Sequence, residues 1–183
     1  MHTTVGLVVA VLAAGQSKRF GPADKLLSFY HGKALAKHVA LRLQNLPFVE
    51  ACVVTRTMAV AGLFNQPRIK PVFVPPGKGQ AASFHAAIQF ARKRRASHVL
   101  LLLADMPKLT PETLARFCAC RSHAPVMARC GKVSLPPVLI PHCLFARLSG
   151  LHGDSGAGSI LRRLPNIRFL DITPEETVDI DQR

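Results

Sequence analysis

The chain has 183 residues, 49% of them apolar, and a formal net charge of +14. This length and apolar content predict one soluble domain over 1–183, and no run approaches the roughly 18 consecutive apolar residues that a membrane span needs. The positive charge is compatible with a solvated basic surface, a nucleotide, a phosphorylated substrate or nucleic acid, and by itself it does not choose among them.

The five cysteines predict a reducing compartment. Their odd number, together with the lack of a secretory signal, argues against a disulfide framework and favours the cytoplasm. Zinc is the alternative, since His123 and His142 lie near Cys118, Cys120 and Cys130 in the sequence. One residue separates Cys118 from Cys120, however, where structural zinc sites place two to four, so ordinary thiols are preferred.

An apolar run opens the chain. Residues 5–12 are rich in Val and Leu without polar alternation, which predicts a strand buried on both faces of a mostly parallel sheet. A signal-peptide core is the alternative, but no cation precedes the run and the first one, Lys18, follows it. Gly15 then lets the backbone approach a ligand, and Lys18, Arg19 and Lys25 follow, which predicts a loop that binds phosphate.

Strands and helices then alternate, which is typical of βαβ units. We expect a helix over 33–46, strands over 50–55 and 71–74, and a helix after the glycine loop 77–79. A glycine loop that opens a helix presents free N–H groups to an anion or a base edge. The basic cluster 92–95 lacks interleaved aromatic residues, so we interpret it as a solvated helix end and consider nucleic acid an improbable partner.

Residues 98–104 predict a central strand, and Asp105 follows it at once. Ligands of open parallel sheets bind at the carboxyl ends of the strands, so a carboxylate there can hold a metal beside a nucleotide. The alternative is that Asp105 only caps the next helix. Thr110, followed by Pro111, already fits that capping role.

The remaining segments continue the α/β pattern as far as the C-terminus. We expect helices over 111–121 and 142–148, and extended segments over 125–130, 134–140, 167–172 and 177–180. Residues 150–158 form a second glycine-rich loop, for which a flexible turn and a ligand-facing loop are equally good interpretations.

Several motifs now resemble one family, the MobA-like nucleotidyltransferases. Residues 12–27, LAAGQSKRFGPADKLL, are similar to its first signature, and the other motifs follow in the family's order: GQAASFHAAI, ADMP, PPVLIP, GDSGAGSIL and VDID. PPVLIP followed by GDSGAG resembles the molybdenum cofactor cytidylyltransferase branch more than the guanylyltransferase branch. The resemblance implies a Rossmann-like three-layer α/β sandwich of the nucleotide-diphospho-sugar transferase type.

The resemblance also implies an activity, in which the phosphate of a molybdopterin-type substrate attacks CTP and pyrophosphate is released. It assigns catalytic roles to Arg19, Lys25 and Asp105. Asp105 would bind Mg²⁺, with Asp179 or Asp181 as a second ligand. Further contacts to the nucleotide fall at Leu12, Ala13, Ala14, Gly15, Gly79 and Ser83, and contacts to the second substrate at Asp154 and Gly156.

Two alternatives stay open at this point. One is a related transferase that uses GTP or acts on another small phosphorylated molecule. The other is a non-catalytic protein that binds nucleotides or nucleic acid, which the charge of +14 makes plausible. Binding to nucleic acid would weaken steeply with salt and would be indifferent to Asp105, whereas pyrophosphate release would depend on it.

Overall fold

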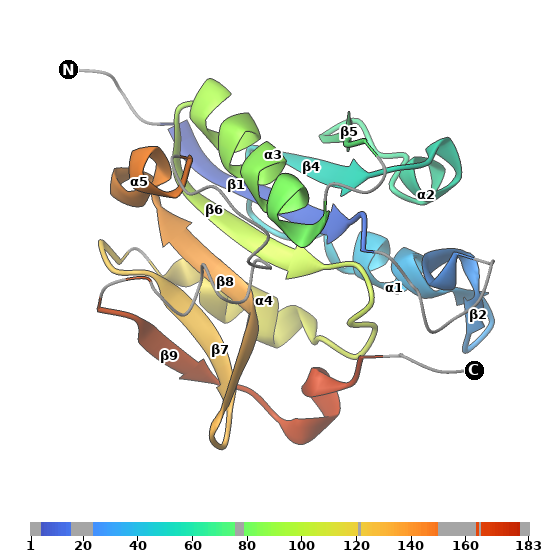
Figure 1. Ribbon diagram of the computed structural model, residues 1–183. Coiled ribbons are helices and arrows are strands. Elements are labelled where there is room, and N and C mark those ends of the chain that lie inside the picture. Colours follow the sequence, from blue (N-terminus) through green and yellow to red (C-terminus); the bar gives the residue numbers. More distant parts are fainter. Residues whose placement is uncertain are drawn as a thin grey trace.

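A computed structural model describes residues 5–15, 24–75, 79–120, 122–149, 164 and 166–179. A seven-stranded sheet forms its centre, in the order β5-β4-β1-β6-β8-β7-β9 (Figure 1). The strands are β1 Val5–Ala13, β4 Glu50–Thr55, β5 Ile69–Phe73, β6 Ala96–Leu103, β7 Val126–Cys130, β8 Val133–Pro141 and β9 Arg168–Asp171, with a separate hairpin of β2 Phe29–Tyr30 and β3 Lys33–Ala34. The helices are α1 Leu35–Arg42, α2 Met58–Leu63, α3 Gly79–Lys93, α4 Pro111–Ala119 and α5 Phe145–Ser149, with 3-10 turns η1 Lys25–Leu27, η2 His142–Leu144 and η3 Pro174–Thr177.

The sheet is mostly parallel, as the sequence predicted. β1 pairs in parallel with both β4 and β6, and the pairs β4–β5 and β7–β9 are also parallel. β8 is antiparallel to its two neighbours, β6 and β7. The order of the first strands therefore reverses at β1, because the chain passes from β1 to β4 and β5 on one side and then crosses to β6 on the other.

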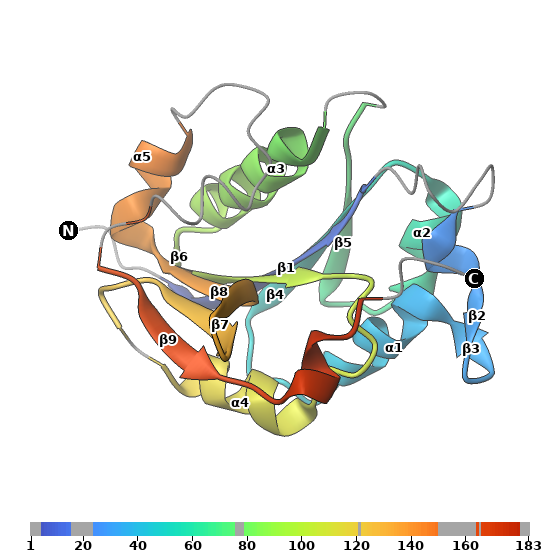
Figure 2. The same cartoon turned by 60° about the horizontal axis from the view of Figure 1, so that its bottom comes forward.

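Helices cover both faces of the sheet, so the predicted three-layer sandwich is confirmed. Figure 2 places α3 and α5 on one face and α1 and α4 on the other, and α2 packs into the same core as α1 and α4. Within β1, Val9 and Val11 belong to one core and Val8 and Ala10 to the other. Burial on both sides explains why the apolar run of this strand shows no polar alternation. In the described ranges, no helix is long and apolar enough to cross a membrane.

Phe84 is fully buried in the core between α3 and the sheet. We expect Phe84→Ala to lower the free energy of unfolding by about 3–5 kcal/mol, since it removes a large side chain and leaves a cavity. Urea denaturation followed by circular dichroism measures the change. Gln89→Ala, at an exposed position of the same helix, serves as the control and should shift the free energy of unfolding by less than about 0.5 kcal/mol. A similar loss for both variants would contradict this assignment of the core.

The structure corrects two predictions about local elements and adds one helix. The extended segment expected over 177–180 is wrong for its described part, because Thr177 ends the 3-10 turn η3 that begins at Pro174. The first helix is shorter than 33–46, since residues 33–34 pair with 29–30 across a turn in which His31 and Gly32 both have positive φ. Helix α2 was not predicted, although Thr57 caps it by accepting a hydrogen bond from the Val60 N–H.

Candidate functional site

The candidate site lies where β1 and β6 end side by side. Leu12 is in register with Leu103, and the Ala104 N–H donates to the Leu12 carbonyl at 3.1 Å. This pairing places Asp105 beside the end of β1, at the point where the strand order reverses. In open α/β sheets such a reversal creates a crevice at the carboxyl ends of the strands, and this is where ligands bind.

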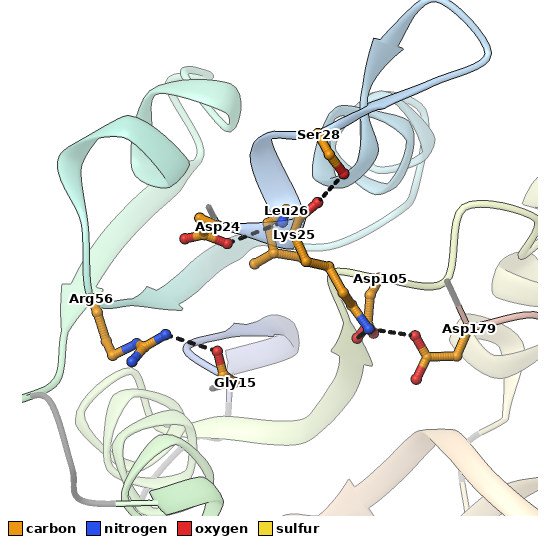
Figure 3. Close-up of polar contacts among 8 residues, drawn as sticks. All are labelled: Gly15, Asp24, Lys25, Leu26, Ser28, Arg56, Asp105 and Asp179. Carbon is orange, nitrogen blue, oxygen red and sulfur yellow. Dashed lines mark hydrogen bonds and ion pairs between the residues drawn. The ribbon is translucent and has the colours of Figure 1, made fainter. Parts of the chain in front are cut away.

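Lys25 is presented by the short turn η1. The Asp24 carboxylate accepts a hydrogen bond from the Leu26 N–H at 3.0 Å, and the Ser28 hydroxyl donates to the Lys25 carbonyl at 2.6 Å (Figure 3). Lys25 is only 6% exposed. Because both ends of the turn are held, the lysine side chain is directed across the end of the sheet.

The Lys25 ammonium bridges two carboxylates that come from distant parts of the chain. Its Nζ lies 2.9 Å from Asp105 Oδ2 and 2.8 Å from Asp179 Oδ1 (Figure 3). The side chains of Asp105 and Asp179 are 22% and 41% exposed. One positive and two negative charges thus meet at a partly buried point, which leaves a net negative charge and oxygen atoms that solvent can reach.

This group of side chains brings together two of the three residues predicted to be catalytic, Lys25 and Asp105. It also includes Asp179, which the sequence offered only as an alternative to Asp181 for the second carboxylate. Arg19, Asp154, Gly156 and Asp181 lie outside the described residues, so their predicted roles stay predictions.

Of the other residues predicted to contact the nucleotide, four lie at the end of β1 and two at the start of α3. Leu12 and Ala13 end β1, and Ala14 and Gly15 directly follow it. Gly79 is the first residue of α3, and Ser83 lies just over one turn further on. The Ser83 hydroxyl is buried and has no hydrogen-bond partner among the described residues. A buried orphan hydroxyl near a ligand site is a natural hydrogen-bonding group for that ligand.

The sequence interpretation missed Arg56, which lies near the carboxyl end of β1. It follows β4, and its Nη2 donates to the Gly15 carbonyl at 2.9 Å (Figure 3). The bond fixes the backbone at the start of the loop expected to bind phosphate and adds a cation to that region. The available signal was positional, because Arg56 directly follows a predicted strand whose carboxyl end lies beside that of β1.

Two of the five thiols are buried, one in β4 and one in α4. Cys52 is fully buried in β4, and burial raises the pKa of its thiol to about 12, so it is protonated at neutral pH. Cys118 is buried on the apolar face of α4, as the sequence predicted. Among the described residues, no three His, Cys, Asp or Glu side chains gather closely enough to hold a metal by themselves. A cation at Asp105 and Asp179 would therefore need ligands from a substrate, from water or from residues outside the described part.

Curated proteins similar to this chain include the following two. The purine catabolism protein PucB of Bacillus subtilis is 25% identical over 166 residues, which cover 85% of this chain and 80% of that protein. A probable molybdenum cofactor guanylyltransferase of Pyrococcus horikoshii is 29% identical over 106 residues, or 58% of this chain and 52% of that protein.

Solved structures and a family model agree with these similarities. The crystal structure of Rv0371c from Mycobacterium tuberculosis superposes with a TM-score of 0.81 at 24% identity, covering 97% of this chain and 94% of that one. A second crystal structure of Rv0371c, in complex with manganese, gives a TM-score of 0.71 at 22% identity, with 91% and 88% covered. The family model of the MobA-like NTP transferase domain matches residues 9–167, a range that begins in β1 and contains both Lys25 and Asp105. The chain therefore belongs to the family of MobA-like NTP transferase domains.

Proposed function

We propose that the chain is a cytidylyltransferase, which joins the CMP moiety of CTP to the phosphate of a molybdopterin-type substrate and releases pyrophosphate. The observation that carries this proposal is the Lys25 ammonium held between Asp105 and Asp179 at the ends of β1 and β6, in a chain of the MobA-like family. The choice of CTP and of the pterin acceptor rests on the sequence, on PPVLIP followed by GDSGAG.

The proposed reaction makes few chemical demands on the protein. An oxygen of the acceptor phosphate forms a bond to the α-phosphorus of CTP, and the bond from that phosphorus to the oxygen bridging the β-phosphate breaks, so the electron pair leaves with pyrophosphate. The attacking oxygen is already ionised, so no general base is required. The protein must hold two polyanions in line and offset their charge, which positioned cations do best.

Lys25 and Arg19 are the side chains that we assign to the triphosphate. Lys25 already lies at the end of β1, where the main chain of Leu12 to Gly15 can face the phosphates. Arg56 stabilises that main chain through its hydrogen bond to Gly15. Gly79 and Ser83 are assigned to the base, and the buried Ser83 hydroxyl without a protein partner supports this assignment. Asp154 and Gly156 are assigned to the acceptor.

Asp105 and Asp179 are the residues that would hold a divalent cation, with Asp181 as a further candidate. Their fit is chemical: two carboxylates that converge on one point offer hard oxygen ligands, and Mg²⁺ binds through one or two carboxylates together with substrate phosphates and water. When bound, such a cation offsets the charge of the triphosphate and of the leaving pyrophosphate. The manganese in the Rv0371c crystal structure supports a divalent cation here as well.

A panel of nucleotides tests the proposal. We expect CTP with Mg²⁺ or Mn²⁺ to raise the melting temperature more than GTP, ATP or UTP do, and EDTA to abolish this difference. With the pterin phosphate as acceptor, pyrophosphate release should require the cation. A preference for GTP would replace the cytidylyl assignment by a guanylyl one, an alternative that the Pyrococcus relative favours. The absence of any selective shift would overturn the proposed transferase.

A further inference from the structure

Glu176 is a buried carboxylate at the C-terminal side of the site, and each of its hydrogen-bond partners among the described residues is a donor. Its Oε1 accepts from the Thr110 N–H at 3.0 Å and from the Thr110 hydroxyl at 2.7 Å, and its Oε2 accepts from the Thr173 N–H at 3.2 Å. The residue is 3% exposed. Burial raises the pKa of Glu176, but the hydrogen bonds from Thr110, Thr113 and Thr173 outweigh burial, so the pKa lies below its usual value.

The direction of the Thr110 hydroxyl is fixed by a second bond. Its oxygen accepts from the Thr113 N–H at 3.2 Å, the contact that caps α4, so its proton is available for Glu176. An acceptor-only carboxylate satisfies this set of donors, whereas a carboxamide cannot. In either orientation, the NH₂ of a glutamine would face at least one donor.

Thr110 and Glu176 connect the two segments that carry the carboxylates of the site. Thr110 lies five residues after Asp105, and Glu176 lies three residues before Asp179. The turn that carries Glu176 is closed just before Asp179, because Thr177 Oγ1 donates to the Pro174 carbonyl at 2.7 Å and the Val178 N–H donates to the Glu175 carbonyl at 3.4 Å. A bond between Thr110 and Glu176 therefore limits how far Asp179 can move from Asp105.

The ion pair that precedes this segment, between Asp171 and Arg129, is too far from Asp179 along the chain to hold it near Asp105. Asp171, in β9, accepts from Arg129 Nε at 2.9 Å, and both side chains are largely exposed. Asp179 lies eight residues after Asp171 in the sequence. Within η3, Glu176 is the buried residue. It is thus the buried attachment point nearest to Asp179 in the described part of the tail.

We propose that Glu176 is a positioning residue, which, through Thr110, holds Asp179 against Lys25 and so completes the pair of carboxylates formed with Asp105. This inference rests on the proposed function where it concerns the binding of a cation. The arrangement of Asp179 against Lys25 can be tested without any nucleotide or metal.

The first experiment measures how fast an amine reagent modifies Lys25 in the apo protein, by quantitative mass spectrometry. Only the neutral amine of a lysine reacts with such a reagent. A carboxylate beside the lysine favours the protonated, unreactive form, so removal of the carboxylate speeds the labelling. We expect Asp179→Asn and Glu176→Gln each to speed the labelling of Lys25 by up to about tenfold. The double variant should be no faster than Asp179→Asn alone, because Glu176 acts through Asp179.

Matched controls separate positioning from general destabilisation. Glu175→Gln makes the same chemical change at the exposed neighbouring position of η3 and should leave the labelling of Lys25 unchanged. Lys33, an exposed lysine of the β2–β3 hairpin, reports any general change of reactivity within each variant. Thr110→Ser keeps both donors to Glu176 and should retain the slow labelling, whereas Thr110→Val removes the hydroxyl donor and should speed it. The test therefore does not depend on Glu176→Gln alone.

A second measurement titrates Mn²⁺ into the same proteins. Glu176→Gln should weaken Mn²⁺ binding as much as Asp179→Asn does, and combining the two should add no further loss. If the wild-type protein bound no Mn²⁺ even in the presence of CTP, the proposed metal-dependent function would fail, while the labelling of Lys25 would still decide the role of Glu176. Labelling of Lys25 at the wild-type rate in Glu176→Gln, with faster labelling in Asp179→Asn, would overturn the inference.

Discussion

Replacement of Lys25 by methionine is expected to reduce the rate of pyrophosphate release from CTP by a factor of about a thousand. Methionine keeps most of the volume of the lysine side chain but removes the ammonium, and the loss of one preorganised charge at a transition state costs about 10²–10³ in rate. Initial rates at saturating CTP, with Mg²⁺ present, measure the change. Lys33→Met, eight residues further along and exposed, is the control and should keep the wild-type rate.

In the absence of nucleotide, the same variant should gain affinity for a divalent cation, although it loses activity. The Lys25 ammonium occupies oxygens of both Asp105 and Asp179, so it competes with a divalent cation for these carboxylates. We expect Lys25→Met to bind Mn²⁺ more tightly than the wild type in a titration without CTP. Weaker Mn²⁺ binding together with a normal transfer rate would contradict both roles assigned to Lys25.

Asp105→Asn is expected to produce the second large loss, at least about a hundredfold in the rate of pyrophosphate release. Asparagine keeps the shape of the side chain but removes the charge that pairs with Lys25 and that a divalent cation requires. Rates measured over a series of Mg²⁺ concentrations should show a higher Mg²⁺ requirement as well as a lower maximum.

Asp171→Asn provides the matched control for Asp105→Asn. Asp171 is an exposed carboxylate that pairs with Arg129 near the end of β9, and its pKa is lowered chiefly by the hydrogen bond from Arg129. Because exposed pairs of this kind contribute about 0–1 kcal/mol, the variant should keep its activity. An Asp105→Asn protein within a few-fold of the wild-type rate would exclude Asp105 from the proposed site.

Local patterns in the sequence predicted much of the fold. The apolar run of β1, the β4 strand over Glu50–Thr55 and the face of α3 formed by Phe84, Ala87, Ile88 and Ala91 are all found as predicted, because side-chain periodicity reports burial directly. Helix α2 was missed because it has only six residues, too few for a periodic pattern. The turn η3 was misjudged because its Val-Asp continuation resembles a strand, whereas Pro174 and the buried Glu176 stabilise a turn.

In the candidate site, too, some residues were predicted from the sequence and others were found only in the structure. Lys25 and Asp105 were predicted from the sequence because each follows a strand that the composition identifies, and the carboxyl ends of neighbouring parallel strands meet. Asp179 could not be chosen over Asp181 in that way, and Arg56 and Glu176 gave no motif. Their places depend on contacts across 41, 66 and 154 residues of chain, from Arg56 to Gly15, from Glu176 to Thr110 and from Asp179 to Lys25.

By itself, then, the sequence determined the alternation of strands and helices, the cations that follow β1 along the chain and the carboxylate after β6. The tertiary structure alone decided that one lysine lies between two aspartates and that a buried glutamate ties their segments together. The physical reason is the range of the interactions. Propensity, capping and periodicity act within a few residues, whereas an ion pair at the end of a sheet depends on strand order and on how the last turn packs against α4.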